Sequence, residues 1–337
     1  MGSDNRKKII VFGATGNIGA YFVDYCKQNF NAEEFEVIAV GRKDTQFFQK
    51  NGIKYFKVDI TRESDFDVLP MKNIYAVVNA AGVLPAYVKE NDPFIYINTN
   101  ISGGLRILEY ARKSHADRVL YTQTWAEQAG YWGRKEVLSP GLPRKLLYTG
   151  DHAFYAITKT MIVETMEYYK QEFGLKNFVF RLPNVYLYHP DMYYYVDGKP
   201  KLTAYRYMIE KAITGDPIEM WGNPDAFKDI LYVKDLCQLM YKALFADIQG
   251  GIYNAGTGIK TTLREQIEGI VRVFSPREKQ SEIIPVPEKP GFVSFVMDIE
   301  NATEELDYEP HYTYLEYLED YKKERIAKRF DAMWHDK

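Results

Sequence analysis

Tyr155 and Lys159 are four residues apart in a segment whose apolar residues recur at helical spacing. Side chains at this spacing lie on one face of a helix, about one turn apart. A nearby ammonium group stabilises a phenolate, so such a pair can carry a proton well below the model phenol pKa of about 10. We therefore expect proton-transfer chemistry at this pair, provided that other elements place a substrate beside the phenol.

The spacing alone does not identify the pair, because the chain contains 28 tyrosines. Only Tyr155 and Lys159 open a long, well-patterned helix and also follow an apolar strand that ends in the hydroxyl-bearing run Thr122-Gln123-Thr124. We therefore select them over three other pairs with the same spacing, which are Tyr131/Lys135, Tyr195/Lys199 and Tyr207/Lys211.

A glycine-rich turn follows the first apolar strand and leads into the first helix. Its spacing, Gly-x-x-Gly-x-x-Gly, differs from the commoner Gly-x-Gly-x-x-Gly. Glycines at this junction allow a tight turn and let a pyrophosphate approach the N–H groups of a helix N-terminus. The turn therefore predicts a dinucleotide site formed by Gly13, Thr15, Gly16, Asn17, Ile18 and Gly19.

The end of the second strand indicates which dinucleotide is bound. An acidic residue there binds the ribose hydroxyl of NAD, whereas an arginine accommodates the 2′-phosphate of NADP. The strand ends Val40-Gly41-Arg42-Lys43, with no carboxylate before Asp44. We therefore predict NADP rather than NAD, bound by Arg42 and Lys43; two solvated cations at a strand end are the alternative.

Two further strand ends supply candidate cofactor contacts. Asp59-Ile60 follows the third strand, and Ala80-Ala81-Gly82 follows Asn79 at the end of the fourth. Ligands collect at the carboxyl edge of open α/β sheets, and small residues let a cofactor pass close to the backbone. We assign both segments to the cofactor site, although an ordinary turn would explain Ala80-Ala81-Gly82 nearly as well.

The first half of the chain alternates short apolar runs with helical patterns, which predicts an α/β fold with a doubly wound parallel Rossmann sheet. The expected helices are residues 18–29, 102–113 and 153–173. The expected strands are residues 8–12, 36–40, 55–58, 76–79, 118–122 and 177–181.

The pattern changes after Arg181. Residues 186–200 are rich in Tyr, Pro, Asp and Gly and predict a loop over a cleft, and strands are expected at 230–233 and 251–254. Helices are expected at 204–214 and 262–273, with a charged terminal helix at 317–329. We predict a Rossmann domain of residues 1–185 plus about 226–256, a discontinuous substrate lobe of about 186–225 plus 257–320, and a charged helix or tail at 321–337.

Composition excludes several classes of function. The net charge of −3 gives no case for nucleic acid, and no apolar run approaches the ~20 residues of a membrane span. Neither the two cysteines nor the five histidines show metal-ligand spacing, so we expect no metal site. The first residues lack a secretory pattern, and a cytoplasmic location is expected.

Several ordered motifs resemble the extended short-chain dehydrogenase/reductase family, in its NAD(P)-dependent epimerase/dehydratase branch. They are the glycine turn, Asn100-Ile101-Ser102-Gly103-Gly104-Leu105, Thr124, Tyr155-Ala156-Ile157-Thr158-Lys159, Arg181-Leu182-Pro183-Asn184-Val185-Tyr186, the stretch 228–236 and Tyr253-Asn254-Ala255-Gly256. The resemblance covers almost the whole chain.

The resemblance implies a role for each matching residue. Tyr155 would be the acid/base, and Lys159 would hold the nicotinamide ribose and lower the pKa of Tyr155. Thr124 would bind the reacting oxygen, and Asn100 would order the site. A nucleotide-sugar-like substrate would meet Asn184, Lys228 and Lys289. The resemblance also implies a homodimer built on residues 102–113 and 153–173.

Three departures limit what the resemblance implies. Dehydratases of this branch carry Asp-Glu after the catalytic threonine, whereas this chain has Trp125-Ala126, with Glu127 displaced by two positions; elimination of water is therefore not expected. Lysines replace the arginines that hold the diphosphate, and Tyr186-Leu187-Tyr188 replaces Tyr-Gly-Pro. We expect an epimerase, with an NADPH-dependent carbonyl or keto-sugar reductase and a non-catalytic NADP-binding regulator as alternatives.

Overall fold

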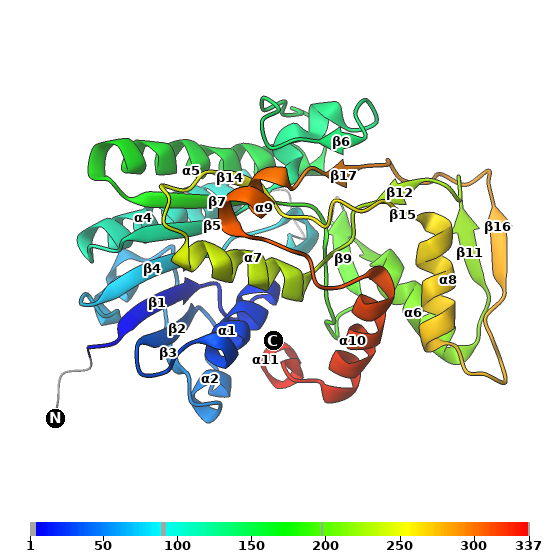
Figure 1. Cartoon of the computed structure of the whole chain (residues 1–337), viewed down its shortest axis with the longest axis horizontal. Coiled ribbons are helices and arrows are strands. Elements are labelled where there is room, and N and C mark those ends of the chain that lie inside the picture. Colours follow the sequence, from blue (N-terminus) through cyan, green and yellow to red (C-terminus); the bar gives the residue numbers. More distant parts are fainter. Residues whose placement is uncertain (1–4, 89–91, 197, 336–337) are drawn as a thin grey trace.

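The computed structural model describes residues 5–88, 92–196 and 198–335. At its centre lies a sheet of seven parallel strands in the order β14-β7-β5-β4-β1-β2-β3 (Figure 1). This order confirms the predicted doubly wound Rossmann-type sheet. The strands are β1 (Lys7–Phe12), β2 (Phe35–Gly41), β3 (Lys54–Lys57), β4 (Ile74–Asn79), β5 (Arg118–Thr124), β7 (Lys176–Leu182) and β14 (Ile252–Asn254).

Helices cover both faces of this sheet (Figure 1). Alternate residues of β1 enter two separate cores: Ile9 and Val11 belong to one, and Ile10 and Phe12 belong to the other. Burial on both faces explains why the strands are continuously apolar in sequence. The first core receives α1 (Asn17–Asn29) and α7 (Val233–Phe245), and the second receives α4 (Gly104–Lys113) and α5 (Asp151–Phe173).

The helical segment before α4 starts earlier than the sequence predicts. The sequence predicts a start at residue 102, but helical backbone begins at α3 (Pro93–Tyr96) and continues through a π-helical stretch, η3 (Ile97–Gly103), into α4. Asp92 caps the start by accepting a hydrogen bond from the Phe94 N–H at 2.9 Å. π-Helical turns often occur at functional sites, and this one contains Asn100.

The chain after β7 builds a smaller group of elements beside the sheet (Figure 1). The loop predicted over residues 186–200 is partly wrong, because β9 and β10 pair there as an antiparallel hairpin. The strand predicted at 230–233 is also shorter than expected: β13 pairs only with β8, outside the central sheet, and Val233 already begins α7. The elements are β8 (Val185–Tyr186), β9 (Tyr193–Val196), β10 (Lys199–Leu202), α6 (Ala204–Thr214), β11 (Ile218–Trp221), β12 (Phe227–Lys228), β13 (Leu231–Tyr232), β15 (Thr261–Thr262), α8 (Leu263–Phe274), β16 (Ile283–Val286), β17 (Val296–Met297) and α9 (Glu300–Leu306).

The C-terminal part is more deeply packed than the predicted charged helix or tail. Helix α10 (Tyr314–Ala327) starts at a capping box formed by Thr313 and Glu316, and it buries Tyr317, Leu318 and Tyr321. A further short helix, α11 (Asp331–His335), packs Trp334 against Tyr21 of α1, with ring centroids 6.4 Å apart. Periodicity missed this burial because the apolar residues of α10 are interleaved with charged ones.

The remaining elements are short. They are α2 (Phe47–Lys50), the 3-10 turns η1 (Glu63–Val68), η2 (Pro85–Tyr87) and η4 (Trp125–Tyr131), and β6 (Val137–Leu138), which pairs with β17. Among the residues described, no helix is long and apolar enough to span a bilayer.

Candidate functional site

The glycine turn between β1 and α1 packs directly against the end of β4. Gly13 has φ +80°, and a Cβ there would lie 2.6 Å from the Ala80 carbonyl carbon and from the Ala81 nitrogen. A Cβ on Gly19 would meet the Gly13 carbonyl oxygen. The structure therefore brings together two predicted cofactor segments, 13–19 and 80–82; Gly13 allows that approach, and Gly19 allows the turn itself to close.

The N-terminus of α1 presents N–H groups that no side chain caps in the described part of the chain. Its first turn contains no acidic residue, so the partial positive charge of the helix end is uncompensated. Asn17 donates a hydrogen bond from Nδ2 to the Tyr87 hydroxyl at 3.0 Å, which places η2 beside the turn. These features fit the pyrophosphate of a dinucleotide.

Arg42 and Lys43, the two neighbouring cations at the end of β2, have different surroundings. Lys43 donates from Nζ to the Met333 carbonyl oxygen at 3.1 Å, so α11 engages it. Arg42 is exposed and close enough to Asp59 to help lower the pKa of that carboxyl. A Cβ on Gly41 would lie 2.9 Å from the Thr15 hydroxyl oxygen. The contact with Thr15 leaves little room for an acidic side chain at residue 41.

Asp59 and Ile60 stand at the end of β3, where the sequence predicts them. Burial tends to raise the pKa of Asp59, but the Thr61 N–H and hydroxyl both bond its Oδ1, at 3.0 and 2.8 Å, and the net pKa is lowered. The Ile60 side chain packs against Gly103, where a Cβ would lie 2.7 Å from Ile60 Cδ1. This contact links the edge of β3 to the π-helical stretch.

The predicted proton-transfer group is assembled from β5 and α5. The Thr124 hydroxyl accepts the Ala126 N–H at 3.2 Å and caps η4, and Thr124 also hydrogen-bonds the phenol of Tyr155. Tyr155 and Lys159 both lie in α5 and are almost fully buried, at 8% and 4% exposure. Thr124 and Tyr155 thus meet at the carboxyl edge of the sheet, where ligands bind in this architecture, and Lys159 follows one helical turn after Tyr155.

Burial dominates the electrostatics of this group. Burial raises the pKa of Tyr155, and the Thr124 hydrogen bond opposes that rise. Burial also lowers the pKa of Lys159 to about 7. The sequence argument expected Lys159 to lower the pKa of Tyr155, whereas the net direction here is upward, because desolvation disfavours the phenolate.

Lys159 has an aromatic neighbour in place of an anionic one. Its Nζ lies 4.0 Å from the centre of the Tyr121 ring, and no carboxylate forms an ion pair with it among the residues described. A Cβ built on Gly82 would lie 3.8 Å from the same Nζ. The amine thus lies next to the small-residue end of β4, where its donors can bind hydroxyl groups of a ligand.

Asn100, in the π-helical stretch, hydrogen-bonds both to the segment after β4 and to α5. Its Oδ1 accepts the Val83 N–H at 2.8 Å, and its Nδ2 donates to the Val83 carbonyl oxygen and to the Thr158 hydroxyl, both at 3.2 Å. Thr158 lies between Tyr155 and Lys159 in α5. Asn100 is 4% exposed, and it connects the segment after β4 to the helix that carries the predicted catalytic pair.

The three predicted substrate residues are not brought together in the same way. Asn184 is exposed just after β7. Burial lowers the pKa of Lys228 to about 8, and its Nζ lies 3.9 Å from the centre of the Phe292 ring. Lys289 instead forms an ion pair with Glu219 at 2.5 Å and lies over the Trp221 ring. Lys289 is therefore engaged at the β11–β16 pair.

A buried polar cluster next to Thr124 was not identified as part of the site from the sequence. Glu127 is 0% exposed, and its carboxylate accepts hydrogen bonds from three residues. These are Arg181 Nε at 2.6 Å, Gln123 Nε2 at 3.0 Å and Arg144 Nε at 3.1 Å. The sequence does draw attention to Glu127, as an acid displaced from the dehydratase pattern, and to Arg181, within a family-like motif, but nothing local in the sequence pairs them.

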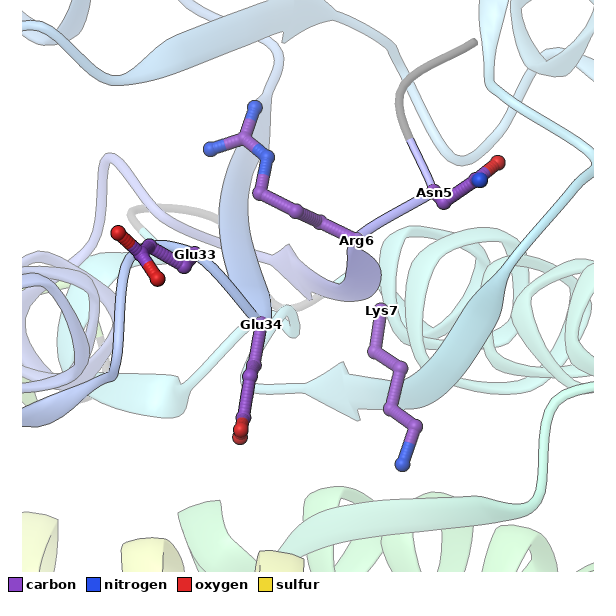
Figure 2. Close-up of a pocket in the computed structure, with 5 residues that line it drawn as sticks. All are labelled: Asn5, Arg6, Lys7, Glu33 and Glu34. Carbon is purple, nitrogen blue, oxygen red and sulfur yellow. The ribbon is translucent and has the colours of Figure 1, made fainter.

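A shallow pocket at the opposite edge of the sheet is not part of this site. Figure 2 shows its lining of Asn5, Arg6, Lys7, Glu33 and Glu34, around the start of β1 and the segment before β2. Tyr155 and Lys159 lie at the carboxyl edge, so this pocket has no contact with the predicted chemistry. Residues 5–88, 92–196 and 198–335 contain no cluster of three or more His, Cys, Asp or Glu suited to a metal ion.

Comparisons with known proteins agree with the observed fold. The model of the NAD dependent epimerase/dehydratase family matches residues 9–256. A putative UDP-glucose 4-epimerase of Methanocaldococcus jannaschii is 24% identical over 312 residues, covering 90% of this chain and 93% of that protein.

Solved structures show the same fold. The Thermotoga maritima UDP-glucose 4-epimerase with UDP-glucose aligns with a TM-score of 0.75 at 21% identity, covering 95% of this chain and 99% of that one. The Thermus thermophilus UDP-glucose 4-epimerase in complex with NAD aligns with a TM-score of 0.71 at 22% identity, covering 94% of this chain and 99% of that one.

Proposed function

The chain belongs to the NAD dependent epimerase/dehydratase family, and from this premise we propose that it is an NAD(P)-dependent epimerase of a nucleotide sugar. The observation that carries the proposal is the hydrogen bond between Thr124 and the buried phenol of Tyr155 at the carboxyl edge of the sheet, with Lys159 one helical turn away and close to Gly82. A protein that only binds a dinucleotide has no need of a buried phenol hydrogen-bonded to a threonine hydroxyl.

Each side chain has a role in the proposed reaction. Thr124 binds the oxygen of the reacting carbon, and the Tyr155 phenolate takes the hydroxyl proton as the C–H bond breaks. A nicotinamide held at the glycine turn would supply reversible hydride transfer, so that the alcohol could become a ketone and be reduced again. Tyr155 would return the proton to the oxygen during that reduction, so neither protons nor electrons are consumed overall.

Lys159 supports two parts of this reaction. Its donors bind the ribose hydroxyls of the cofactor, and its charge lowers the phenol pKa once the amine is protonated. Because burial lowers the pKa of Lys159 to about 7, hydrogen bonds that the ammonium donates to cofactor hydroxyls would favour its charged form. We expect Asn100 to keep the helix segment that carries Tyr155 and Lys159 in place through its bond to Thr158.

We propose NADP as the cofactor, bound at its 2′-phosphate by Arg42 alone. Arg42 is exposed, so its guanidinium is accessible to a phosphate, while Lys43 donates a hydrogen bond to the Met333 carbonyl oxygen. The contact between Gly41 and Thr15 supports the proposal, because an acidic residue there would clash. The glycine turn, Asp59-Ile60 and Ala80-Ala81-Gly82 form the rest of the proposed cofactor site.

We propose that the group of elements after β8, apart from α7 and β14, forms the substrate-side lobe, with Asn184 and Lys228 as substrate contacts.

The surroundings of Glu127 disfavour a dehydration reaction, since both of its carboxylate oxygens accept hydrogen bonds from buried donors. A buried carboxylate held in this way is poorly placed to exchange a proton with a sugar carbon. The sequence-based prediction of a cytoplasmic location stands as part of this proposal.

An NADPH-dependent keto-sugar reductase is the second candidate, and the exposed Arg42 favours it, because NADP selectivity suits a net reduction. Cofactor stoichiometry separates the two. An epimerase given UDP-glucose and catalytic NADP forms many equivalents of the epimer per NADP, detected by NMR, with no net change in absorbance at 340 nm. A reductase consumes one NADPH for each keto group reduced. Absence of both reactions across UDP- and dTDP-sugars would overturn the enzymatic proposal.

We also propose a homodimer through α4 and α5. Four large apolar side chains on these two helices are exposed: Leu105 at 42%, Met161 at 50%, Tyr168 at 56% and Phe173 at 44%. Pairing with a second copy would bury them. The test is light scattering on the wild type and on Met161→Asp, with a monomeric wild type as the result that contradicts the proposal.

A further inference from the structure

We propose that Gln123 and Glu127 are positioning residues that hold Thr124 in register with Tyr155 and Lys159. This inference rests on the proposed function, in which Thr124 binds the reacting oxygen. It assigns to Glu127, the acid displaced by two positions from the dehydratase pattern, a role in holding the site rather than in proton transfer.

Gln123 contacts both Thr124 and Glu127. Its Oε1 accepts the backbone N–H of Thr124 at 2.9 Å, and its Nε2 donates to Glu127 Oε2 at 3.0 Å. The amide has only one orientation that satisfies both bonds, because an ionised carboxylate only accepts and a backbone N–H only donates. Glu127 therefore fixes which way the Gln123 amide faces, and the amide fixes the backbone of Thr124.

The same amide reaches the helix that carries the proton-transfer pair. Gln123 Nε2 lies 3.3 Å from the Thr160 hydroxyl, and Thr160 follows Lys159 directly in α5. Arg144, which binds Glu127, also forms an ion pair with Glu164 of α5. Both links span the gap between the end of β5 and α5. The distance between Thr124 and Tyr155 is therefore controlled by this cluster as well as by the sheet.

Glu127 is itself anchored from the neighbouring strand. Arg181, which is 1% exposed on β7, donates from Nε to Glu127 Oε1 at 2.6 Å and from Nη1 to Asn254 Oδ1 at 3.0 Å. A buried ion pair that loses one partner leaves an uncompensated charge, which is costly. The carboxylate is therefore restrained strongly, and the restraint passes through Gln123 to Thr124.

The test is a double-mutant cycle with Gln123→Leu and Thr124→Ala, which leaves the Glu127 ion pairs intact. With UDP-glucose and NADP as probes, Gln123→Leu should lower kcat by about 10- to 100-fold, because small displacements of a catalytic group have effects of this size. KM should change by less than about threefold. In the Thr124→Ala background, Gln123→Leu should cost less than about a further twofold, since it acts through Thr124. Equal losses in both backgrounds would overturn the proposal.

Gln171→Leu is the matched control. Gln171 lies in the same helix as Tyr155, is exposed and bonds only Glu167 among the residues described, at 2.7 Å. It should keep wild-type kcat. If Gln123→Leu lacks a cooperative melting transition, Gln123→Met, which preserves the unbranched shape, takes its place in the cycle.

A second readout separates this inference from the proposed function. If the wild type converts none of the sugar nucleotides tested, the proposed function fails, but the position of Thr124 can still be followed. In protein labelled with 13Cζ-tyrosine and bound to NADP, the Tyr155 resonance is assigned by its loss in Tyr155→Phe. Gln123→Leu should shift this resonance and Gln171→Leu should not; an unshifted resonance in Gln123→Leu would overturn the positioning role.

Discussion

Lys43 donates a hydrogen bond from Nζ to the carbonyl oxygen of Met333 at 3.1 Å, which ties the end of β2 to the last described helix. The bond removes one of two adjacent cations from the proposed 2′-phosphate site. Arg42, its neighbour, remains exposed. The two residues therefore have different roles, although the sequence offers them as equivalent.

Arg42→Ala should raise the Kd for NADP by about tenfold and leave that for NAD nearly unchanged, because a charge-assisted hydrogen bond contributes about 1.5 kcal/mol or more. Lys43→Ala should leave the NADP/NAD ratio within about twofold and lower the melting temperature. Fluorescence titration of both cofactors measures the ratio. Equal weakening of NADP and NAD by Arg42→Ala would remove the case for NADP.

The sheet was predictable from the sequence because its strands are buried on both faces. In β1, Ile9, Ile10, Val11 and Phe12 are all 0% exposed. A strand buried on both faces is apolar at every position, so its sequence shows a continuous apolar run. The glycine turn was predictable for a related reason. Only glycine permits the close approach of residues 13 and 80–81, so the requirement is visible in the sequence itself.

Other features depend on contacts between distant residues and leave no local signal. The Lys43–Met333 bond joins residues 290 positions apart, and no periodicity at either end predicts it. The hairpin of β9 and β10 forms in a segment whose Tyr, Pro and Gly content favoured a loop, and β9 packs against η2. Glu127 was noticed in the sequence, but its pairing with Arg181 depends on the adjacency of β5 and β7 in the sheet.

Tyr155→Phe should abolish turnover while changing the Kd for NADP by less than about twofold, because it removes only the proton-carrying oxygen. The measurement is single-turnover hydride transfer with the best nucleotide sugar found. Tyr207→Phe is the control, since Tyr207 is 41% exposed and Lys211 also lies four residues after it. Activity above about a tenth of wild type in Tyr155→Phe would end its assignment as the acid/base.

The lowered pKa of Lys159 predicts how the stability of the fold depends on pH. Burial lowers its pKa in the folded protein to about 7, whereas in the unfolded chain the pKa should be about 10.4. The unfolded state thus binds more protons between these values, and stability from this residue rises with pH there, by at most about 1.4 kcal/mol per pH unit. Below pH ~7 both states are protonated, and the full cost of the buried charge is present.

Replacing the amine with an apolar group of similar length isolates this effect. Lys159→Met should be more stable than the wild type at about pH 6, and its advantage should shrink as the pH rises from about 7 towards 9. Urea unfolding at each pH gives the difference in the free energy of unfolding, in which the titration of all other groups cancels. A difference that stays constant with pH would show that Lys159 keeps an ordinary pKa.

We predict that Gly13→Ala weakens cofactor binding by more than backbone strain alone can cause. At φ +80° an alanine is strained by about 1–2 kcal/mol, and its Cβ would also lie 2.6 Å from the backbone of Ala80 and Ala81. Gly52 is a matched control, with φ +69° and no atom within 4 Å of its Cβ position. Gly52→Ala should therefore show the strain alone, a loss of about 1–2 kcal/mol in unfolding free energy with cofactor affinity unchanged.

Gly13→Ala should lose more stability and weaken NADP and NAD binding by at least about tenfold, because the end of β4 must move away from the pyrophosphate site. Calorimetric titration of both variants decides the matter: equal cofactor affinities would place the dinucleotide away from the glycine turn.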